Sequence, residues 1–482
     1  MAKRKMSTWE RLGSGKMNRK ERREWQQRLH AEDTGLEVVH PDAAGIDIGN
    51  ASHFVAVPPD RDERPVREFG SWTADLRGMV EWLKRCGIRT VALQSTGVYG
   101  VAVQEILEGE GFEVYLVNAR GTKNLPGRKS DVQECQWLRK LHTYGLLRNS
   151  FHPPEQIRAV RTIWRQRDRL VKEAGREVQQ MQKALTTMNV QLANAIRDVS
   201  GLTGQAIIRA ILKGERDPQQ LAKLRHYRVA ASEAEIAHSL EGNWRQDVWF
   251  ELQQVVDAYD FHQKHIAACD VELQKYLSAL PMRRGPGAGE GSTADVPAKE
   301  SKKRRPHKLP QNPPRFDLAA ELQRRMGVDR TAIDGVEVLT TQVILSELGP
   351  DFRASFPSED HFASWLELAP RRDVSGGKVL RQKARTSNNR VANALRMAAQ
   401  ALGSSNRYLG ARYRHLKARL GGQKAVKAMA RYLACLIYRL LTQGRAYVDR
   451  GAAHFESKRT ERELVALRRK AAELGMQLVE VS

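Results

Sequence analysis

The sequence predicts an α/β domain near the N-terminus, joined to a long coiled-coil hairpin and then to a mainly helical C-terminal part. Three observations favour this fold class. Short β-type runs alternate with helical spacing over residues 41–150. Apolar residues then recur in heptads between residues 155 and 280, as they do in coiled coils. Residues 316–450 again carry apolar side chains at mainly helical spacing.

Composition divides the chain further. Residues 1–28 hold ten Lys or Arg, three Glu and no apolar run, which predicts a basic arm rather than a secretory signal. Residues 281–315 hold seven prolines and the basic run Lys302–Arg305, the composition of a flexible linker. The expected segments are a basic arm (1–40), the α/β domain (41–150), a coiled-coil and helical domain (151–280), the linker (281–315), a helical C-terminal domain (316–450) and a final helix (451–482).

The α/β domain has the element order of a ribonuclease-H-like sheet, because three strands are followed by alternating helices and strands. Gly49 and Asn50 form the turn between the first two strands. Ser130 and Gln133 predict a capping box at the start of the last helix. The strands are expected at 44–48, 54–57, 67–72, 90–93 and 114–117, and the helices at 76–86, 101–107 and 131 to about 147.

Two heptad stripes predict the hairpin, with a compact helical segment at about 201–240 between them. The first stripe is Ile157, Trp164, Val171, Val178, Leu185 and Leu192, with Val160, Ala174, Met181 and Met188 in its second seam. Arg167 is the exception in that seam. The second stripe is Val248, Leu252, Val255, Tyr259, Ile266, Cys269, Leu273, Tyr276 and Leu280, interrupted by His262. These stripes are expected to form a core. A shorter heptad from Leu464 to Leu478 favours an oligomer contact.

The charge of the chain favours a polyanionic partner. Among 482 residues, 80 Lys and Arg face 56 Asp and Glu, which gives a net charge of +24 and an isoelectric point near 10.0. Nucleic acid is the simplest partner for such an excess; a membrane surface and an indifferent basic surface are the alternatives. We find no run of 18 or more apolar residues. The four cysteines have no metal-type spacing, which favours a reduced cytoplasm without disulfides.

Three carboxylates stand where a nuclease would need them. Asp47 lies between two isoleucines in a buried strand, where a charge is costly unless it is paired or bound to a metal. Asp131 and Glu134 share one face of a first helical turn. Such acids also serve as simple partners of the helix dipole, and Asp47 can be solvated beside Gly49. Together, however, the three acids predict a site for hard Mg²⁺ ions.

Two further positions bear on the chemistry. Gln94 ends a strand where a ribonuclease-H-like centre usually has a carboxylate, and its neutral oxygen is a weaker ligand; Glu105 in the next helix is the fallback. Ser375 is followed by two glycines, which allow close approach to a phosphodiester. Three basic residues near Ser375 could balance transition-state charge: Arg371, Arg372 and Lys378. Ser-Gly-Gly also occurs in plain loops.

In this order, five stretches resemble the DEDD transposases of the insertion-sequence-110 (IS110) family. They are Ala44–Gly49, Leu93–Tyr99, Val117–Arg120, Pro126–Leu138 and Asp373–Lys378. The resemblance covers about residues 40 to 450. It implies a RuvC-like N-terminal domain, a coiled coil, and a C-terminal transposase domain with a catalytic serine.

The resemblance also implies roles for particular residues. Asp47, Asp131 and Glu134 would hold Mg²⁺, and Ser375 would attack a DNA phosphate to form a transient serine–phosphate link. Gln94 occupies the position of a family glutamate, and Glu134 that of the last family aspartate. The residues expected to contact nucleic acid are Arg128, Lys129, Arg371, Arg372, Lys378 and Arg381.

The implied function is an RNA-guided DNA recombinase that excises and inserts its own element. Its partners would be donor and target double-stranded DNA, a structured non-coding bridge RNA, and further copies of the chain in a homo-oligomer, as a dimer of dimers. The implied location is the bacterial cytoplasm, at the nucleoid. Two alternatives remain: a RuvC-like structure-specific nuclease that uses water, and a catalytically weakened nucleic-acid-binding descendant, for which Gln94 is the main argument.

Overall fold

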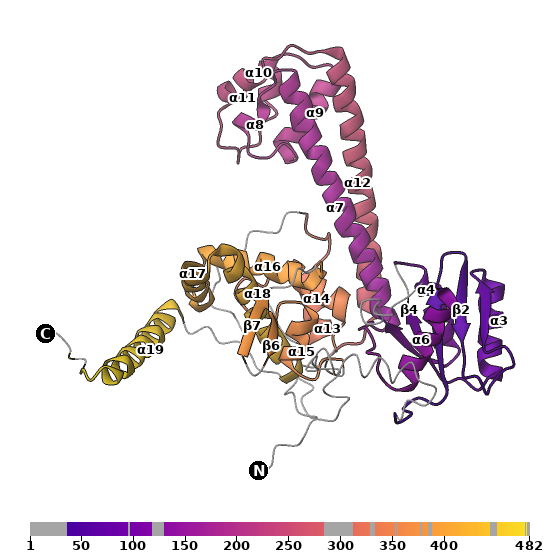
Figure 1. The fold of residues 1–482 in the computed structure, drawn as a ribbon. Helices are drawn as coiled ribbons and strands as arrows, with labels where there is room; N and C mark the ends of the chain where they lie inside the picture. The colour runs from indigo at the N-terminus through magenta and orange to yellow at the C-terminus, as the bar shows by residue number, and fades with distance from the viewer. Residues whose placement is uncertain are drawn as a thin grey trace. The chain divides into compact units, whose positions relative to one another are not determined.

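The structure, a computed structural model, consists of two compact units, residues 1–152 and 153–482 (Figure 1). Each unit is described by itself. The described residues are 36–94, 97–117, 130–283, 312–327, 333–351, 353, 355–375, 378–383, 388–443, 451–477 and 479. The basic arm and most of the proline-rich linker therefore lie outside the described residues.

The first unit is a five-stranded sheet covered by helices, which confirms the predicted α/β fold class. The strand order is β3-β2-β1-β4-β5, in which β2 is antiparallel to both of its neighbours and β1, β4 and β5 are parallel. The strands are β1 (Ala43–Ile48), β2 (Ser52–Ala56), β3 (Val66–Gly70), β4 (Thr90–Gln94) and β5 (Glu113–Val117). The helices are α3 (Thr73–Arg85), α4 (Gly100–Gly109) and α6 (Asp131–Thr143).

Alternation along the strands gives the sheet two different faces. Ile46 and Leu93 belong to the apolar core that also contains residues of α3 and α4. The residues that alternate with them along each strand, such as Gly45 and Gln94, contact α6 instead. Asp47 has the same parity as Gly45, so it shares the α6 face.

The helix that begins at Asp131 is shorter than predicted. It ends at Thr143 rather than near residue 147, because Gly145 adopts a left-handed conformation with φ +64°. The amides of Gly145 and Leu146 donate to the carbonyls of His142 and Leu141, both at 2.9 Å, which is a Schellman motif. At the other end, Ser130 accepts a hydrogen bond from the Gln133 amide at 3.3 Å, which is one of the two hydrogen bonds of the predicted capping box.

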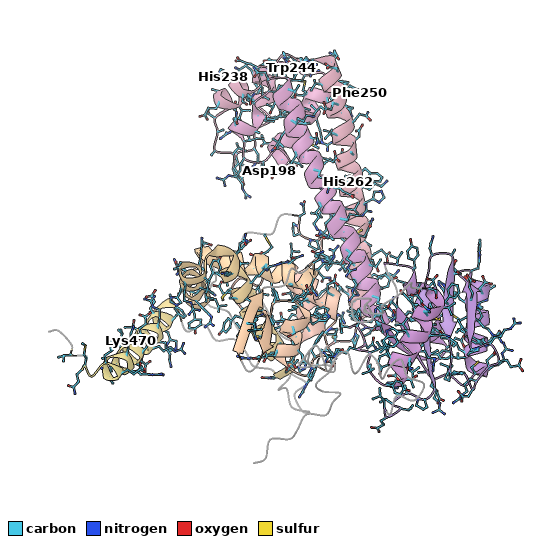
Figure 2. All side chains as sticks on the ribbon, viewed as in Figure 1. Asp198, His238, Trp244, Phe250, His262 and Lys470 are labelled. Atoms are coloured by element: carbon cyan, nitrogen blue, oxygen red, sulfur yellow. The ribbon has the colours of Figure 1, made fainter. Side chains whose placement is uncertain are left out.

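The second unit begins with the predicted hairpin. Two long helices, α7 (Glu155–Thr187) and α12 (Gln246–Ala279), lie side by side in antiparallel directions (Figure 1). Arg167 pairs with Asp270, whereas Lys183, further along α7, pairs with Glu251, nearer the start of α12. His262, which interrupts the second stripe, lies on α12 (Figure 2), and its Nδ1 is 3.9 Å from a Glu173 carboxylate oxygen.

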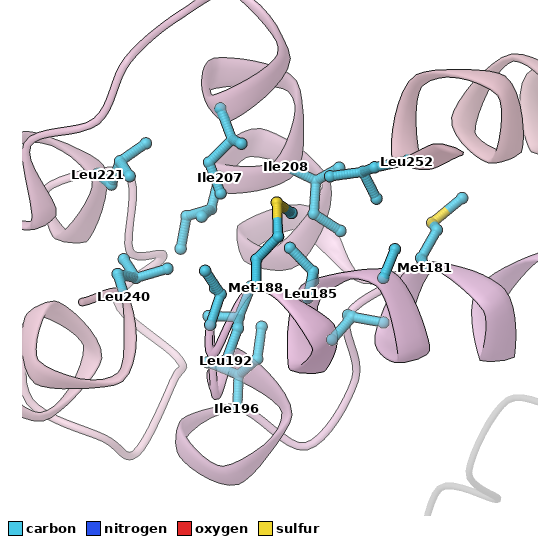
Figure 3. Packing of buried hydrophobic residues seen from close by; sticks show 14 of the residues in the cluster. Met181, Leu185, Met188, Leu192, Ile196, Ile207, Ile208, Leu221, Leu240 and Leu252 are labelled. Atoms are coloured by element: carbon cyan, nitrogen blue, oxygen red, sulfur yellow. The ribbon is translucent and has the colours of Figure 1, made fainter. Parts of the chain in front are cut away.

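The tip of the hairpin is a small apolar core of its own. Leu185 and Met188 from the end of α7 pack with Ile207, Ile208 and Leu252 (Figure 3). The short helices there are α8 (Leu192–Ala195), α9 (Leu202–Leu212), α10 (Pro218–Ala222) and α11 (Glu233–Ser239).

Two details of the heptad prediction were wrong. Leu192 is buried but lies in α8, because Asn189 with φ +55° ends α7. On α12, Val256 is buried in place of the predicted Val255, and Leu277 is buried in place of the predicted Tyr276, which is exposed. An ideal α-helix has 3.6 residues per turn, so positions spaced strictly seven residues apart gradually move away from the buried face.

The rest of the second unit is mainly helical, as predicted. Its helices are α13 (Leu318–Met326), α14 (Val338–Leu348), α15 (Glu359–Trp365), α16 (Arg390–Ala401), α17 (Tyr408–Leu420), α18 (Gly422–Gln443) and α19 (Gly451–Glu473), with a short 3₁₀ turn at Leu402–Ser404. The base of the coiled coil shares an apolar core with α13 and α14 through Trp164, Leu277 and Leu322. None of the described helices is long and apolar enough to cross a membrane.

The sequence analysis missed one element, an antiparallel ribbon of β6 (Arg371–Ser375) and β7 (Lys378–Lys383). Two glycines separate these strands, which is a common signal for a two-residue hairpin.

Candidate active site

Three of the candidate residues come together at one edge of the sheet. In β1 and β4, which are parallel, Asp47 is the register partner of Gln94, and Gln94 is the register partner of Val117 in β5. The strands therefore end at the same edge. Asp47, Gln94 and Glu134 are all half-buried there, and the Gln94 amide nitrogen donates to a Glu134 carboxylate oxygen at 3.1 Å.

Helix α6 runs antiparallel to β4, which explains why its first turn reaches this edge. At the opposite end of the strand, Thr90 Oγ1 lies 2.8 Å from His142 Nε2. Eight helical residues from Glu134 to His142 rise about 12 Å, and four strand residues from Thr90 to Gln94 span about 13 Å. The two lengths match, so both ends of α6 are fixed against the same strand.

Gly45 determines how closely α6 approaches the sheet. A Cβ atom at this position would lie 2.3 Å from the Arg139 backbone nitrogen and 2.4 Å from the Cys135 carbonyl oxygen. No real side chain tolerates such distances to backbone atoms, so only glycine allows this packing. The missing Cβ thereby places Glu134 within reach of Gln94.

Two of the acids influence the same buried thiol. Burial raises the pKa of the Cys135 thiol to about 12, and the negative charges of Asp47 and Asp131 add to the increase. Asp131 itself is exposed in the first turn of α6. The positive end of the helix dipole stabilises carboxylates at this position. Two carboxylates on different elements thus act on the same buried thiol.

The side-chain oxygens of these residues are the type of ligand that a hard divalent cation prefers. Among the described residues, however, no group of three or more His, Cys, Asp or Glu side chains is close enough to hold a metal ion. The Gln94 amide occupies a Glu134 oxygen in this structure. The fallback candidate, Glu105, lies exposed on α4.

Ser375 belongs to the second unit. It is the last residue of β6, and its register partner across the ribbon is Lys378, the first residue of β7. A register shift at Asp373 and Val374 bends the ribbon just before the serine. Of the expected nucleic-acid contacts, Arg371 and Arg372 lie in β6, and Lys378 and Arg381 in β7. Arg128 and Lys129 lie outside the described residues.

The turn Ile333–Val336 is fixed by packing against the end of α16. Gly335 in the Ile333–Val336 turn has φ +82°, and a Cβ there would lie 2.9 Å from the Ala398 carbonyl oxygen. Asp334 accepts a hydrogen bond from the Ser405 hydroxyl, and Ile333 is fully buried. The turn therefore anchors α14 to the end of α16.

The candidate residues fall inside two segments that match known families. Residues 44–190, from β1 through α7, match a family model described as a transposase, the DEDD transposase of IS110. Residues 331–414, which include Ser375, match the model of the IS116/IS110/IS902 transposase family. No curated protein matches the chain. With the sheet and its acidic edge in the first segment and the serine in the second, the chain belongs to the IS110 family of DEDD transposases.

Proposed function

We propose that this transposase cuts and rejoins DNA through a covalent bond to Ser375, assisted by Mg²⁺ at the acidic strand edge. The observation that carries the proposal is the meeting of Asp47, Gln94 and Glu134 in a segment that matches the DEDD transposases. Family membership gives DNA as the substrate. The serine route, the guide RNA and the oligomer are finer proposals.

The serine step is a transesterification. The Ser375 hydroxyl oxygen forms a bond to phosphorus, the hydroxyl proton passes to a base, and the bond from phosphorus to the leaving deoxyribose oxygen breaks. The reverse step, with the hydroxyl of a different strand, releases the serine. The number of ester bonds is unchanged throughout, so no external energy source is needed. Basic residues of the ribbon, such as Lys378 and Arg381, would balance charge at the phosphate.

Asp47, Asp131 and Glu134 are the residues that would hold Mg²⁺. When bound, the ion supplies positive charge to a phosphate oxygen and to the leaving group. The chain itself contributes the placement: β1 holds Asp47, α6 holds Asp131 and Glu134, and Gly45 sets the separation of the two elements. Gln94 would either keep its hydrogen bond to Glu134 or present its carbonyl oxygen to the ion.

A guide RNA and a homo-oligomer complete the proposal. The net charge of +24 suits many phosphate contacts. If base pairing reads the sequence, the protein needs to recognise only backbone and shape. Two exposed apolar residues, Leu467 on α19 and Leu474 just after it, are available for contact between copies. We propose a dimer of dimers in which the acidic edge and Ser375 of different copies complete each centre.

A nucleic-acid-binding protein without cleavage is the second candidate. One observation favours it: the Gln94 amide donates to Glu134, so this pair is held without a cation. Under this alternative, DNA binding would not depend on Mg²⁺ and no strand would be cut.

Covalent trapping tests the main proposal. The full-length protein is incubated with labelled donor and target DNA, candidate RNA transcribed from DNA flanking the gene, and Mg²⁺, and is then run on a denaturing gel. We expect a protein–DNA band that disappears with Ser375→Ala, with Asp131→Ala and without RNA. Two matched controls should keep the band: Ser457→Ala on the exposed α19 helix and Glu81→Ala on α3.

Other outcomes identify the alternatives. Cleaved DNA that survives Ser375→Ala, with no adduct, would establish hydrolysis by water in place of the serine. Tight binding that is independent of Mg²⁺, with neither adduct nor cleavage, would favour the binding-only protein. Gln94→Glu would then be the first substitution to examine for recovered cleavage.

A further inference from the structure

A cavity of ≈ 600 Å³ lies in the second unit between the turn after α15 and the helices α17 and α18. We call it the α17–α18 pocket. Leu368 and Pro370 line it from the turn, Arg412 from α17, and Lys424, Lys427 and Tyr432 from α18. Its volume lies within the range of pockets that hold small organic ligands or parts of larger ones. It is separate from both candidate catalytic residue sets.

The pocket combines an aromatic stack with cations. The Arg412 guanidinium carbon lies 4.1 Å from the centroid of the Tyr432 ring. The Arg412 Nε atom is buried and has no hydrogen-bond partner among the described residues. Lys424 is exposed at the rim, in the first turn of α18. A bound ligand that brings an acceptor oxygen would satisfy the Arg412 donor.

Charge in the pocket points to an anion. Four lining residues are cationic and one, Glu367, is acidic. Arg431 pairs with Asp360 at 2.8 Å. Arg412, Lys424 and Lys427 are the three further cations that line the cavity. The remaining lining is largely apolar and includes Leu368 and Leu420. An anionic ligand with a flat apolar body fits this arrangement.

A nucleotide has this combination of groups. Bases stack on tyrosine rings and on guanidinium planes whatever their sequence, because every base has a π-face. The phosphate would lie toward Lys424 and Lys427. A base can reach such a pocket only from a single strand or after leaving the stack of a duplex.

The chain connects the pocket directly to the serine ribbon. Pro370 lines the pocket and immediately precedes β6, whose last residue is Ser375. Five residues of extended strand span about 17 Å, which is close to the length of five stacked base pairs. A nucleotide held in the pocket would therefore be only a few nucleotides along the strand from a phosphate at Ser375.

We infer that the α17–α18 pocket binds an unstacked nucleotide of the DNA strand whose phosphate Ser375 attacks. This inference rests on the proposed function for the choice of strand, whereas the nucleotide chemistry comes from the pocket itself. Holding one nucleotide out of the stack would fix the register of the strand on the ribbon. It would also help to separate the strands before exchange.

Photo-crosslinking and binding on the full-length chain test the inference. The Ser375→Ala variant is used so that the strand stays uncut. The probe is a short single-stranded oligothymidylate carrying one 5-iododeoxyuridine, with a ribose version beside it. We expect crosslinked peptides from α18 around Tyr432, and about tenfold weaker binding after Tyr432→Ala. Tyr432→Phe should bind normally, since the ring is kept.

Two further variants protect the test against misfolding. Ala428→Trp fills the pocket from α18 without removing a ligand contact, and should weaken binding as Tyr432→Ala does. Lys424→Gln should lower the slope of log affinity against log salt by about 0.7 for a single strand. The matched control, Lys458→Gln on the exposed α19 helix, should leave the α18 crosslink in place.

Unchanged binding and crosslinking with Ala428→Trp would overturn the pocket assignment. A crosslink formed only with the ribose probe would overturn the assignment to DNA in favour of the guide RNA. The adduct assay with Ser375 intact is run in parallel. Pocket crosslinking without any adduct would remove the proposed serine chemistry while leaving the pocket as a nucleotide site, so the two failures can be told apart.

Discussion

The two units of the molecule fix their polar side chains in different ways. In the first unit, a glycine contact and an apolar core set the position of α6, and the candidate acids follow from that packing. The second unit relies on arginine–carboxylate pairs. Arg167 and Asp270 are buried together at 2.5 Å, and Arg165 binds Glu347 with two hydrogen bonds.

The difference predicts different sensitivities. A site placed by close packing fails when volume is added, because backbone atoms cannot move apart cheaply. A region held by ion pairs fails when one partner is removed, because the other charge is left buried. Adding a methyl group at Gly45 should therefore damage the acidic strand edge, and deleting the charge of Asp270 should damage the hairpin.

The largest effect is expected from Asp270→Ala. Asp270 accepts hydrogen bonds from Arg167 and from the Arg315 amide, and both charged side chains are nearly fully buried. Removing the carboxylate leaves a buried guanidinium, which should cost about 3–5 kcal/mol. Hydrogen exchange measured on peptides of α7 and α12 in the full-length chain would report the loss.

The exposed pair Arg169–Glu173, which lies on α7 like Arg167, is the matched control. Breaking it with Arg169→Ala should cost less than about 1 kcal/mol. The double substitution Arg167→Leu with Asp270→Leu should recover most of the stability. Equal protection in Asp270→Ala and in the parent chain would show that the ion pair does not hold the hairpin.

Gly45→Ala is the counterpart in the first unit. The new Cβ would meet backbone atoms of Arg139 and Cys135 at under 2.5 Å, so α6 must shift. We expect a loss of about 3 kcal/mol. Gly78→Ala in α3, where nothing lies within 4 Å of the added atom, should instead stabilise the unit by up to about 1 kcal/mol. Similar urea midpoints for the two variants would refute the close-packing argument.

The sequence also predicted different aspects of the two units. The strands of the first unit were predicted within a few residues because buried β runs are bounded by turn residues such as Gly49. The role of Gly45 was not predicted, because a close approach depends on which helix covers the strand. The Gln94–Glu134 contact was likewise beyond local patterns, since 40 residues separate the partners.

In the second unit, the sequence predicted the helices better than their details. Arg167 appeared only as an exception to the heptad, and its partner Asp270 lies 103 residues away. The ribbon that carries the serine was not predicted, although two consecutive glycines, Gly376 and Gly377, are a common hairpin signal. The α17–α18 pocket gave no sequence signal, because its lining comes from three separate elements.

The two units should respond to acid at different pH values. His142 is buried against Thr90, His40 and Tyr115, and burial lowers its pKa from 6.5 to about 4, with the charge of His40 adding to the effect. The unfolded chain therefore binds a proton first as the pH falls. The stabilisation is complete above pH 6.5 and is lost progressively toward pH 4, by about 3 kcal/mol in total.

The carboxylates of the second unit respond later. The pKa of Asp351 is lowered by its hydrogen bond to Arg283, so its contribution is kept until the pH falls below the ordinary value of 3.8. Peptide-resolved hydrogen exchange at pH-corrected times should show α6 and β4 losing protection between pH 6.5 and pH 5 while α18 keeps it. His142→Gln should flatten that response, and an unchanged response in this variant would exclude His142 as its source.

The smallest expected effect concerns the acidic edge itself. Gln94→Glu would place a second carboxylate about 3 Å from Glu134, in place of the amide that now donates to it. Without a divalent cation, repulsion at this half-buried position should destabilise the first unit by about 1 kcal/mol. With Mg²⁺ the order should reverse, because a ligand that binds only the folded state stabilises it in proportion to the logarithm of its concentration. Melting curves of the parent and variant over a Mg²⁺ series, with Gln136→Glu at an exposed position of α6 as a control, measure the difference. A melting temperature that rises with Mg²⁺ equally in all three chains would mean that residue 94 is not part of a cation site, and that the acids at this edge act through α6 packing alone.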